Sequence, residues 1–350
     1  MRRVKQLGPG LLCAACMLLL ILDAKTATNA SRSAVELCLY TVVPNLFPFI
    51  MISIMLTGTI TGFRFRILQP ISKLLGIPQG AQSILLMGFL GGYPVGAQSI
   101  SDSYHAGRLD HSAAVRMLGF CNNAGPAFIF GMISGLFSDP RIPWVIWSIH
   151  VFSGCLVGIL IPKTRSVSFI NKTQTPINVS TVLEKSLKTT GVICGWVIIF
   201  RIIIDFAHKW VFATLPPNAA LMLEGVLELA NGCTAASQIE PEGLRFVYIC
   251  AILGFGGLCV LSQTKSVTKG LGLGSYFPGK VLHCVFSITL SIWIQPLIFP
   301  KCEQFPLNNI AVYFLLLILM ITCIWVLKKK TVAFFANNQY NRKKYSIKGV

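Results

Sequence analysis

The sequence contains few charged residues, and acidic residues are particularly scarce. Only 12% of its 350 residues are charged, with 12 Asp and Glu against 30 Lys and Arg. A soluble domain usually has about 25% charged residues, so the composition argues against an ordinary soluble protein. In place of charge there are apolar residues, 54% of the chain, gathered in long runs such as 310–327.

Several motifs of energy-coupled and catalytic proteins are also absent from the sequence. There is no G-x-x-x-x-G-K-[ST] loop for a nucleotide phosphate and no H-E-x-x-H pair for zinc. Asp102 and Asp110 would suit an intramembrane hydrolase, but they flank a predicted loop and neither lies in the middle of a span. We therefore expect no enzyme activity, no direct use of ATP, no cofactor and no metal site.

The cysteines give no evidence of a disulfide framework. The 12 cysteines are scattered, and most lie inside apolar segments, where Cys behaves as a small hydrophobe. Cys13 and Cys16 form a C-x-x-C pair, but a metal site would require a second pair.

Apolar runs of about 20 residues predict membrane-spanning helices. Helices satisfy their own backbone hydrogen bonds in hydrocarbon, so we predict an all-α polytopic protein of the cell membrane. Short Lys and Arg clusters follow the apolar runs, which is typical of cytoplasmic loops next to lipid and argues against nucleic-acid binding. The predicted spans are 7–24, 38–62, 113–137, 143–161, 187–208, 276–298 and 309–327, with two glycine- or polar-interrupted segments at 81–103 and 245–264.

The chain divides at a polar, proline-containing linker, 163–182. Residues 1–30 resemble a signal peptide, but the spans that follow favour a retained first anchor. The remaining parts are a first half, 31–162, a second half, 183–328, and a basic tail, 329–350.

The two halves align weakly with each other, which predicts an internal and inverted repeat. We align 35–56 with 183–204, 67–83 with 221–237, and 88–99 with 254–264, which pairs Gln98 with Gln263. Each half then contains a span, an interfacial helix, a glycine-broken or re-entrant segment and further spans. Chance similarity between apolar helices is the alternative. Paired interruptions of this kind indicate a transporter site at the midplane.

Residues 88–131 carry a more specific signal. The segment contains a G-Y-P-V-G turn at 92–96 and an Asn-Asn pair followed by Gly-Pro at 122–126, and the second half contains E-x-x-N-G at 228–232. These motifs resemble the sporulation integral membrane proteins of the YlbJ type, which carry a nucleoside-recognition, or Gate, domain. The resemblance implies a relation to concentrative nucleoside transporters and to the membrane part of ferrous-iron transporters. It also implies an endospore-forming source and a role in spore maturation, without indicating a solute.

Candidate solute-binding residues lie at these interruptions. Buried amides in a bilayer either hold helices together or line a polar pathway, and a hairpin tip exposes backbone N–H groups and helix-end dipoles. The candidates are Tyr93, Pro94, Gly96, Gln98, Asn122, Asn123, Gly125, Pro126, Glu228, Asn231 and Gln263.

Charged residues inside apolar segments have plainer explanations. Arg201 and Asp205, four residues apart, predict an intrahelical ion pair. Glu224 and Glu228 predict either a solvated acidic helix face or a carboxylate that couples transport to a cation.

The orientation of the C-terminal tail stays open. Inverted halves place the basic tail outside, against the rule that Lys and Arg concentrate on the cytoplasmic side. If 245–264 spans the membrane fully, the tail returns inside and Lys265, Lys269 and Lys280 become cytoplasmic too.

Two hypotheses for function follow. The first is a transporter-like protein that binds a small polar solute and couples its movement to H⁺ or Na⁺. The second is a membrane scaffold for spore-envelope (cortex) assembly, in which the polar residues only join helices. Expected partners are the lipid bilayer and, in addition, a solute with its coupling ion, spore-envelope proteins or a second copy of the chain.

Overall fold

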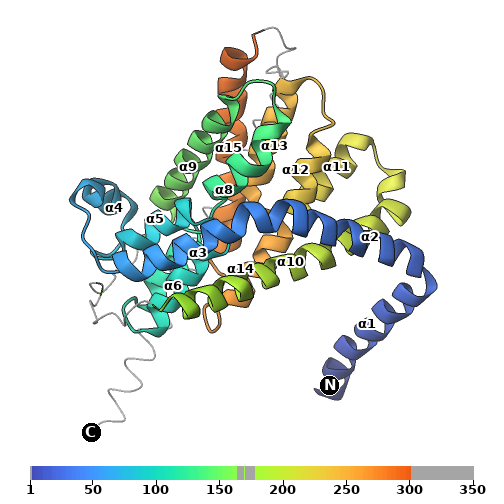
Figure 1. The fold of residues 1–350 in the computed structure, drawn as a ribbon, viewed down its shortest axis with the longest axis horizontal. Helices are drawn as coiled ribbons and strands as arrows, with labels where there is room; N and C mark the ends of the chain where they lie inside the picture. The colour runs from blue at the N-terminus through green and yellow to red at the C-terminus, as the bar shows by residue number, and fades with distance from the viewer. Residues whose placement is uncertain (1, 164–168, 170–177, 301–350) are drawn as a thin grey trace.

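The computed structural model describes residues 2–163, 169 and 178–300, and these fold almost entirely into helices (Figure 1). No strand occurs among these residues, which confirms the all-α prediction. The predicted span 309–327, the tail 329–350 and most of the linker 163–182 lie outside the described residues.

Several helices are long and apolar enough to cross a membrane. The shortest has 19 residues, which at about 1.5 Å per residue matches a hydrocarbon layer of about 30 Å. Their lengths confirm a polytopic helical membrane protein. These helices are Ala24–Ile60, Ile142–Leu160, Val179–Trp210, Glu242–Val267 and Tyr276–Ile298.

The N-terminal region differs from the prediction. The helix α1 (Arg2–Leu22) projects from the body in Figure 1, and its apolar part, Gly8–Leu22, is among the shorter apolar helices. The predicted span 38–62 begins earlier than expected, because one turn of π-helix joins two helices into a single rod. That rod consists of α2 (Ala24–Leu37), η1 (Cys38–Val42) and α3 (Val43–Ile60).

The first half continues with a helical hairpin and a broken helix. The hairpin reverses direction at 91–94. In the broken helix, residues 119–125 are unwound, so the predicted span 113–137 is interrupted at its centre. The elements are η2 (Arg66–Leu68), α4 (Gln69–Leu75), α5 (Gln82–Leu90), α6 (Val95–His105), α7 (His111–Leu118), α8 (Pro126–Phe128), η3 (Ile129–Ile133), η4 (Ser134–Leu136) and α9 (Ile142–Leu160).

The second half contains the same types of element in the same order. A long helix precedes a hairpin that turns at Glu228, a helix broken at Gly256 and a final long helix. The elements are α10 (Val179–Trp210), η5 (Phe212–Thr214), α11 (Pro217–Leu227), α12 (Leu229–Ala236), α13 (Glu242–Phe255), α14 (Gly257–Val267) and α15 (Tyr276–Ile298).

This element order corrects two of the sequence alignments. The first hairpin, which contains 88–99, corresponds to the second hairpin at 217–236, whereas the sequence aligned 88–99 with the broken helix at 254–264. Glycine-rich apolar segments look alike in sequence because glycine marks close backbone approach wherever it occurs. The prediction of a second interfacial helix is also wrong, because 221–237 forms a hairpin whose second arm, α12, is largely buried. An inverted internal repeat stays a prediction.

The outermost helices have large apolar side chains on the outer surface and polar side chains on the inner face, as α15 illustrates. In Figure 1, α3 and α10 cross the lower part of the body, while α9, α13 and α15 stand together behind them. On α15, the side chains of Trp293 and Leu297 are 69% and 82% exposed, whereas Ser291 and Gln295 are buried. Polar residues inside and large apolar residues outside suit a helix whose solvent is lipid.

Candidate functional site

All the helix interruptions meet at one place in the molecule. A Cβ atom on Gly92, at the first hairpin tip, would lie 3.0 Å from the backbone nitrogen of Gly125 in the unwound segment. A Cβ atom on Gly257 would lie 3.3 Å from the backbone nitrogen of Leu229 at the second hairpin tip. Each tip therefore rests against the broken helix of its own half.

One tyrosine links the two halves at this point. Tyr93, from the first hairpin tip, donates a hydrogen bond from its Oη to the carbonyl of Leu253, at 3.4 Å, just before the break in α13–α14. Its hydroxyl also lies against Gly256. Unwound backbone is costly in hydrocarbon unless protein covers it or it lines a cavity, and both conditions hold here.

Glycine permits both hairpins to close. A Cβ atom on Gly96 would lie 2.3 Å from the Cys121 carbonyl oxygen, and one on Gly232 would lie 2.3 Å from the Cα of Gly225. No side chain fits at either distance. The candidate Gly96 therefore has a packing role.

A cleft lies between the tips. Its cavity volume is about 40 Å³, and it is lined mainly by apolar side chains, with few polar groups. A mostly apolar cleft with a small number of placed polar groups is the usual form of a small-molecule site. Of the predicted site residues, Tyr93, Gly125, Glu228 and Gln263 line this cleft.

The two asparagines of the unwound segment make structural hydrogen bonds with their side chains. Asn122 Oδ1 accepts from the backbone N–H of Ala97 at 3.2 Å, and Asn122 Nδ2 donates to Thr264 Oγ1 at 2.9 Å. Asn123 Nδ2 donates to the Phe120 carbonyl at 2.8 Å. Asn122 therefore joins α6 to α14, and the geometry favours the structural alternative for this residue.

The second half has its own polar network around the predicted Glu228 and Asn231. Glu228 Oε2 accepts from Asn231 N at 2.7 Å and from Asn231 Nδ2 at 2.8 Å, so it caps the N-terminus of α12. Asn231 Oδ1 in turn accepts from Arg201 at 2.9 Å. Arg201 also pairs with Asp205 at 2.9 Å, which confirms the predicted intrahelical pair.

The predicted acidic face of Glu224 and Glu228 does not exist. Both residues are buried, and Glu228 lies at the turn between helices rather than on the α11 face. Glu224 instead contacts His208, with 2.5 Å between Oε1 and Nε2. The turn at 228 ends the helix, so the i, i+4 spacing has no meaning there.

The glutamines and prolines among the predicted site residues lie on several elements. Gln98 lies in α6 and accepts from Thr189 Oγ1 at 3.3 Å; it lines a second, more polar cavity with Asp102 and Arg108. Gln263 Nε2 contacts the Cys259 sulfur at 3.3 Å in α14. Pro94 and Pro126 precede or begin the helices that leave the interruptions.

Sequence reasoning missed a basic cluster between the two halves. Lys280, considered above only as a cytoplasmic charge, lies inside α15 and is only 2% exposed. Its Nζ donates to Tyr93 Oη at 3.2 Å and to Asn123 Oδ1 at 3.0 Å. His150 and His283 stack beside it with 4.4 Å between ring centroids. The signal was a lysine three residues before a histidine within an apolar run.

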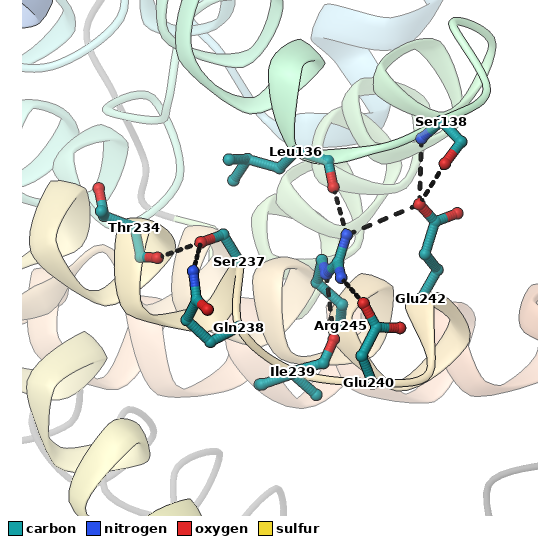
Figure 2. Close-up of polar contacts among 9 residues, drawn as sticks. All are labelled: Leu136, Ser138, Thr234, Ser237, Gln238, Ile239, Glu240, Glu242 and Arg245. Atoms are coloured by element: carbon teal, nitrogen blue, oxygen red, sulfur yellow. Dashed lines mark hydrogen bonds and ion pairs between the residues drawn. The ribbon is translucent and has the colours of Figure 1, made fainter.

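Two buried arginines hold the broken helices against neighbouring elements. Arg245, in α13, donates to the carbonyls of Ile239 at 3.1 Å and Leu136 at 2.7 Å and also pairs with Glu240 (Figure 2). Arg116, in α7, donates to the carbonyl of Gly158 at 2.7 Å at the end of α9. Guanidinium groups thus satisfy the free carbonyls of helix C-termini.

Figure 2 also shows how the second broken helix is tied to the first half. Glu242, at the start of α13, accepts hydrogen bonds from Ser138 N at 3.1 Å and Ser138 Oγ at 2.7 Å. With the Arg245–Leu136 bond, these contacts fix the outer end of one half against the other.

Comparison with known proteins gives one distant relative. The chain is 22% identical over 306 aligned residues to the Sporulation integral membrane protein YlbJ of Bacillus subtilis (strain 168), covering 74% of this chain and 75% of that protein. No family model matches the chain, and no solved structure matches it. The relative is, by its name, an integral membrane protein of sporulation.

Proposed function

We propose that this protein binds a small polar solute in the cleft between the two hairpin tips and moves it across the cell membrane. The observation that carries the proposal is the convergence of two hairpin tips and two helix breaks on one cleft. A protein that only joined other proteins would not need four interrupted elements at one point of its interior. No covalent chemistry is part of this proposal.

The lining of the cleft supports a solute with one polar region and a larger apolar one. Tyr93, Glu228 and Gln263 provide polar groups, while side chains such as Ile50, Phe128 and Val197 provide apolar area. At both tips the hairpin contacts its own broken helix through glycine, with no side chain between the two backbones. We propose that alternating movement of the hairpins opens the cleft to one face and then to the other.

The biological setting is proposed from the distant relative. Because that protein belongs to sporulation, we propose that the chain acts in the membrane of a sporulating cell. The nucleoside-recognition (Gate) assignment belongs to this proposal as well, as does coupling to an ion gradient.

A scaffold function is the second candidate, and the asparagines favour it. Asn122 and Asn231 place their side-chain amides in bonds between helices. On that hypothesis, a spore-envelope protein would bind the outer surface and the cleft would remain empty.

A thermal-shift measurement on the purified protein separates the two candidates. The panel contains nucleosides, small organic anions and amino acids, and a ligand that binds the native state raises the unfolding midpoint as its concentration increases. The test variant is Glu228→Gln, which alters the cleft, and the matched control is Glu184→Gln, an exposed carboxylate on α10.

We expect a saturable shift that Glu228→Gln weakens and Glu184→Gln leaves unchanged. No shift with any ligand, in a protein that is folded and monodisperse, would contradict the transport proposal and favour the scaffold.

A further inference from the structure

The polar residues of α15 form a continuous row along the buried side of the helix. Their spacing of three or four residues places them on one helical face. Each is at most 2% exposed, although α15 is a membrane-spanning helix. The row consists of Lys280, His283, Ser287, Ser291 and Gln295.

Lys280 lacks a counter-ion. Across residues 2–163 and 178–300, no carboxylate oxygen lies within ion-pair distance of its Nζ. Its hydrogen-bond acceptors, Tyr93 and Asn123, are neutral, and Tyr276 adds an aromatic face at 5.8 Å from the ring centroid. A charged lysine at membrane depth without a partner is costly, and such residues mark ion or proton pathways.

The titratable groups around Lys280 are weak acids and bases such as thiols and imidazoles. No carboxylate pairs with it in the described part of the chain. Cys121 approaches from the unwound segment, His150 from α9, and His283 from α15 itself. The backbone N–H of Ala124 donates to His150 Nε2 at 3.0 Å, which leaves the proton of the neutral ring on Nδ1. This Nδ1 is buried and has no partner among the described residues.

Other buried polar atoms beside the row are also unpaired. Ser153 Oγ on α9 and Ser287 Oγ on α15 have no hydrogen-bond partner within the part of the chain that the structure describes. The two helices pack against each other. The hydroxyl and imidazole groups therefore provide donors and acceptors between Lys280 and the far end of α15.

Lys280 is connected to the solute cleft through one side chain. Tyr93 lines the cleft and accepts the hydrogen bond from Lys280, whereas Lys280 itself does not line the cleft. A solute in the cleft would reach Tyr93 first. A protonated Lys280 holds the hairpin tip, through Tyr93, against the unwound segment, through Asn123.

We infer that Lys280 is the binding site for a transported proton, and that protonation of its amine controls the first hairpin tip. The amine lone pair takes a proton from water on one side of the membrane and returns it to water on the other side. Na⁺ would require oxygen ligands in place of an ammonium group. This inference rests on the proposed function, because it supplies the ion that drives the solute.

The test requires no solute. The protein is reconstituted into vesicles on a solid-supported membrane, and a step in pH is applied while the displaced charge is recorded. We expect a transient current from the unmodified protein. Lys280→Gln cannot bind the proton and Lys280→Arg cannot release it, so in both variants the current falls to the level of protein-free vesicles.

Controls separate this effect from misfolding. Lys269→Gln removes an exposed lysine after α14 and should leave the current unchanged. Thermal midpoints in detergent establish that the variants are folded. If Lys280→Gln does not fold, Lys280→Arg, which keeps the charge and donor groups, provides the same test.

Two outcomes would overturn the inference: no current from the unmodified protein, or an undiminished current in a folded Lys280 variant. The solute panel is scored separately. A solute shift without a Lys280-dependent current refutes the proton site alone, and a Lys280-dependent current without any solute shift refutes only the solute proposal.

Discussion

The two hairpins use the same construction with opposite electrostatics. Both close through glycine and both place a tip against a broken helix of their own half. The first tip meets the buried amine of Lys280, whereas the second turns at the buried carboxylate of Glu228. Glu228 is part of a network that contains Arg201, but Lys280 has only neutral acceptors. The second tip thus has an arginine within its hydrogen-bond network, whereas the amine at the first tip has no ion-pair partner among the described residues and is sensitive to a proton.

The largest expected effect concerns the two buried arginines of the broken helices. Arg116→Met leaves carbonyls at the end of α9 without donors and should lower the free energy of unfolding by about 3 kcal/mol. Arg245→Met should cost about 2 kcal/mol, because Glu240 is largely exposed and can be hydrated. Denaturant unfolding in detergent measures both, and a larger loss for Arg245→Met would reverse the comparison.

The glycines that close the hairpins should be equally intolerant in both halves. Gly96→Ala and Gly232→Ala should each lower the free energy of unfolding by about 2 kcal/mol, because the new methyl group overlaps backbone atoms. Gly191→Ala on α10 is the control, since its Cβ would meet open space. If only one hairpin variant is destabilised, the two hairpins do not share this construction.

A double-mutant cycle should separate the two polar networks. Arg201→Gln and Glu228→Gln should couple by about 1 kcal/mol, because both act on Asn231. Arg201→Gln and Lys280→Gln share no contact and should be additive within about 0.5 kcal/mol. The unfolding free energies of the single and double variants measure both couplings, and strong coupling of Lys280 to Arg201 would show one network.

The smallest effect is expected at the hydrogen bonds between Ser138 and Glu242, which connect the two halves. Ser138→Ala removes a hydroxyl from Glu242 in an exposed contact and should change the free energy of unfolding by no more than about 0.5 kcal/mol. The backbone bond from Ser138 N to Glu242 remains. A much larger loss of unfolding free energy would mean that the Ser138–Glu242 contact also stabilises the two hairpins.

Composition and hydropathy determined the class of this protein. Long apolar runs can satisfy their backbone hydrogen bonds only as helices in hydrocarbon, and the predicted span 276–298 coincides with α15. The glycine and proline clusters also indicated where helices break, because these residues act locally on the backbone. The Arg201–Asp205 pair followed from helical spacing alone.

The sequence could not assign partners across the fold. It could not distinguish Asn122, which bonds to Thr264, from Glu228, which lines the cleft, because both are polar residues beside glycine. Lys280 looked like a cytoplasmic charge at the start of a predicted span. Its role depends on Tyr93 and Asn123, which are 187 and 157 residues away in the chain. Local chemistry thus specified the helices and their breaks, whereas long-range packing decided which polar groups meet at the centre.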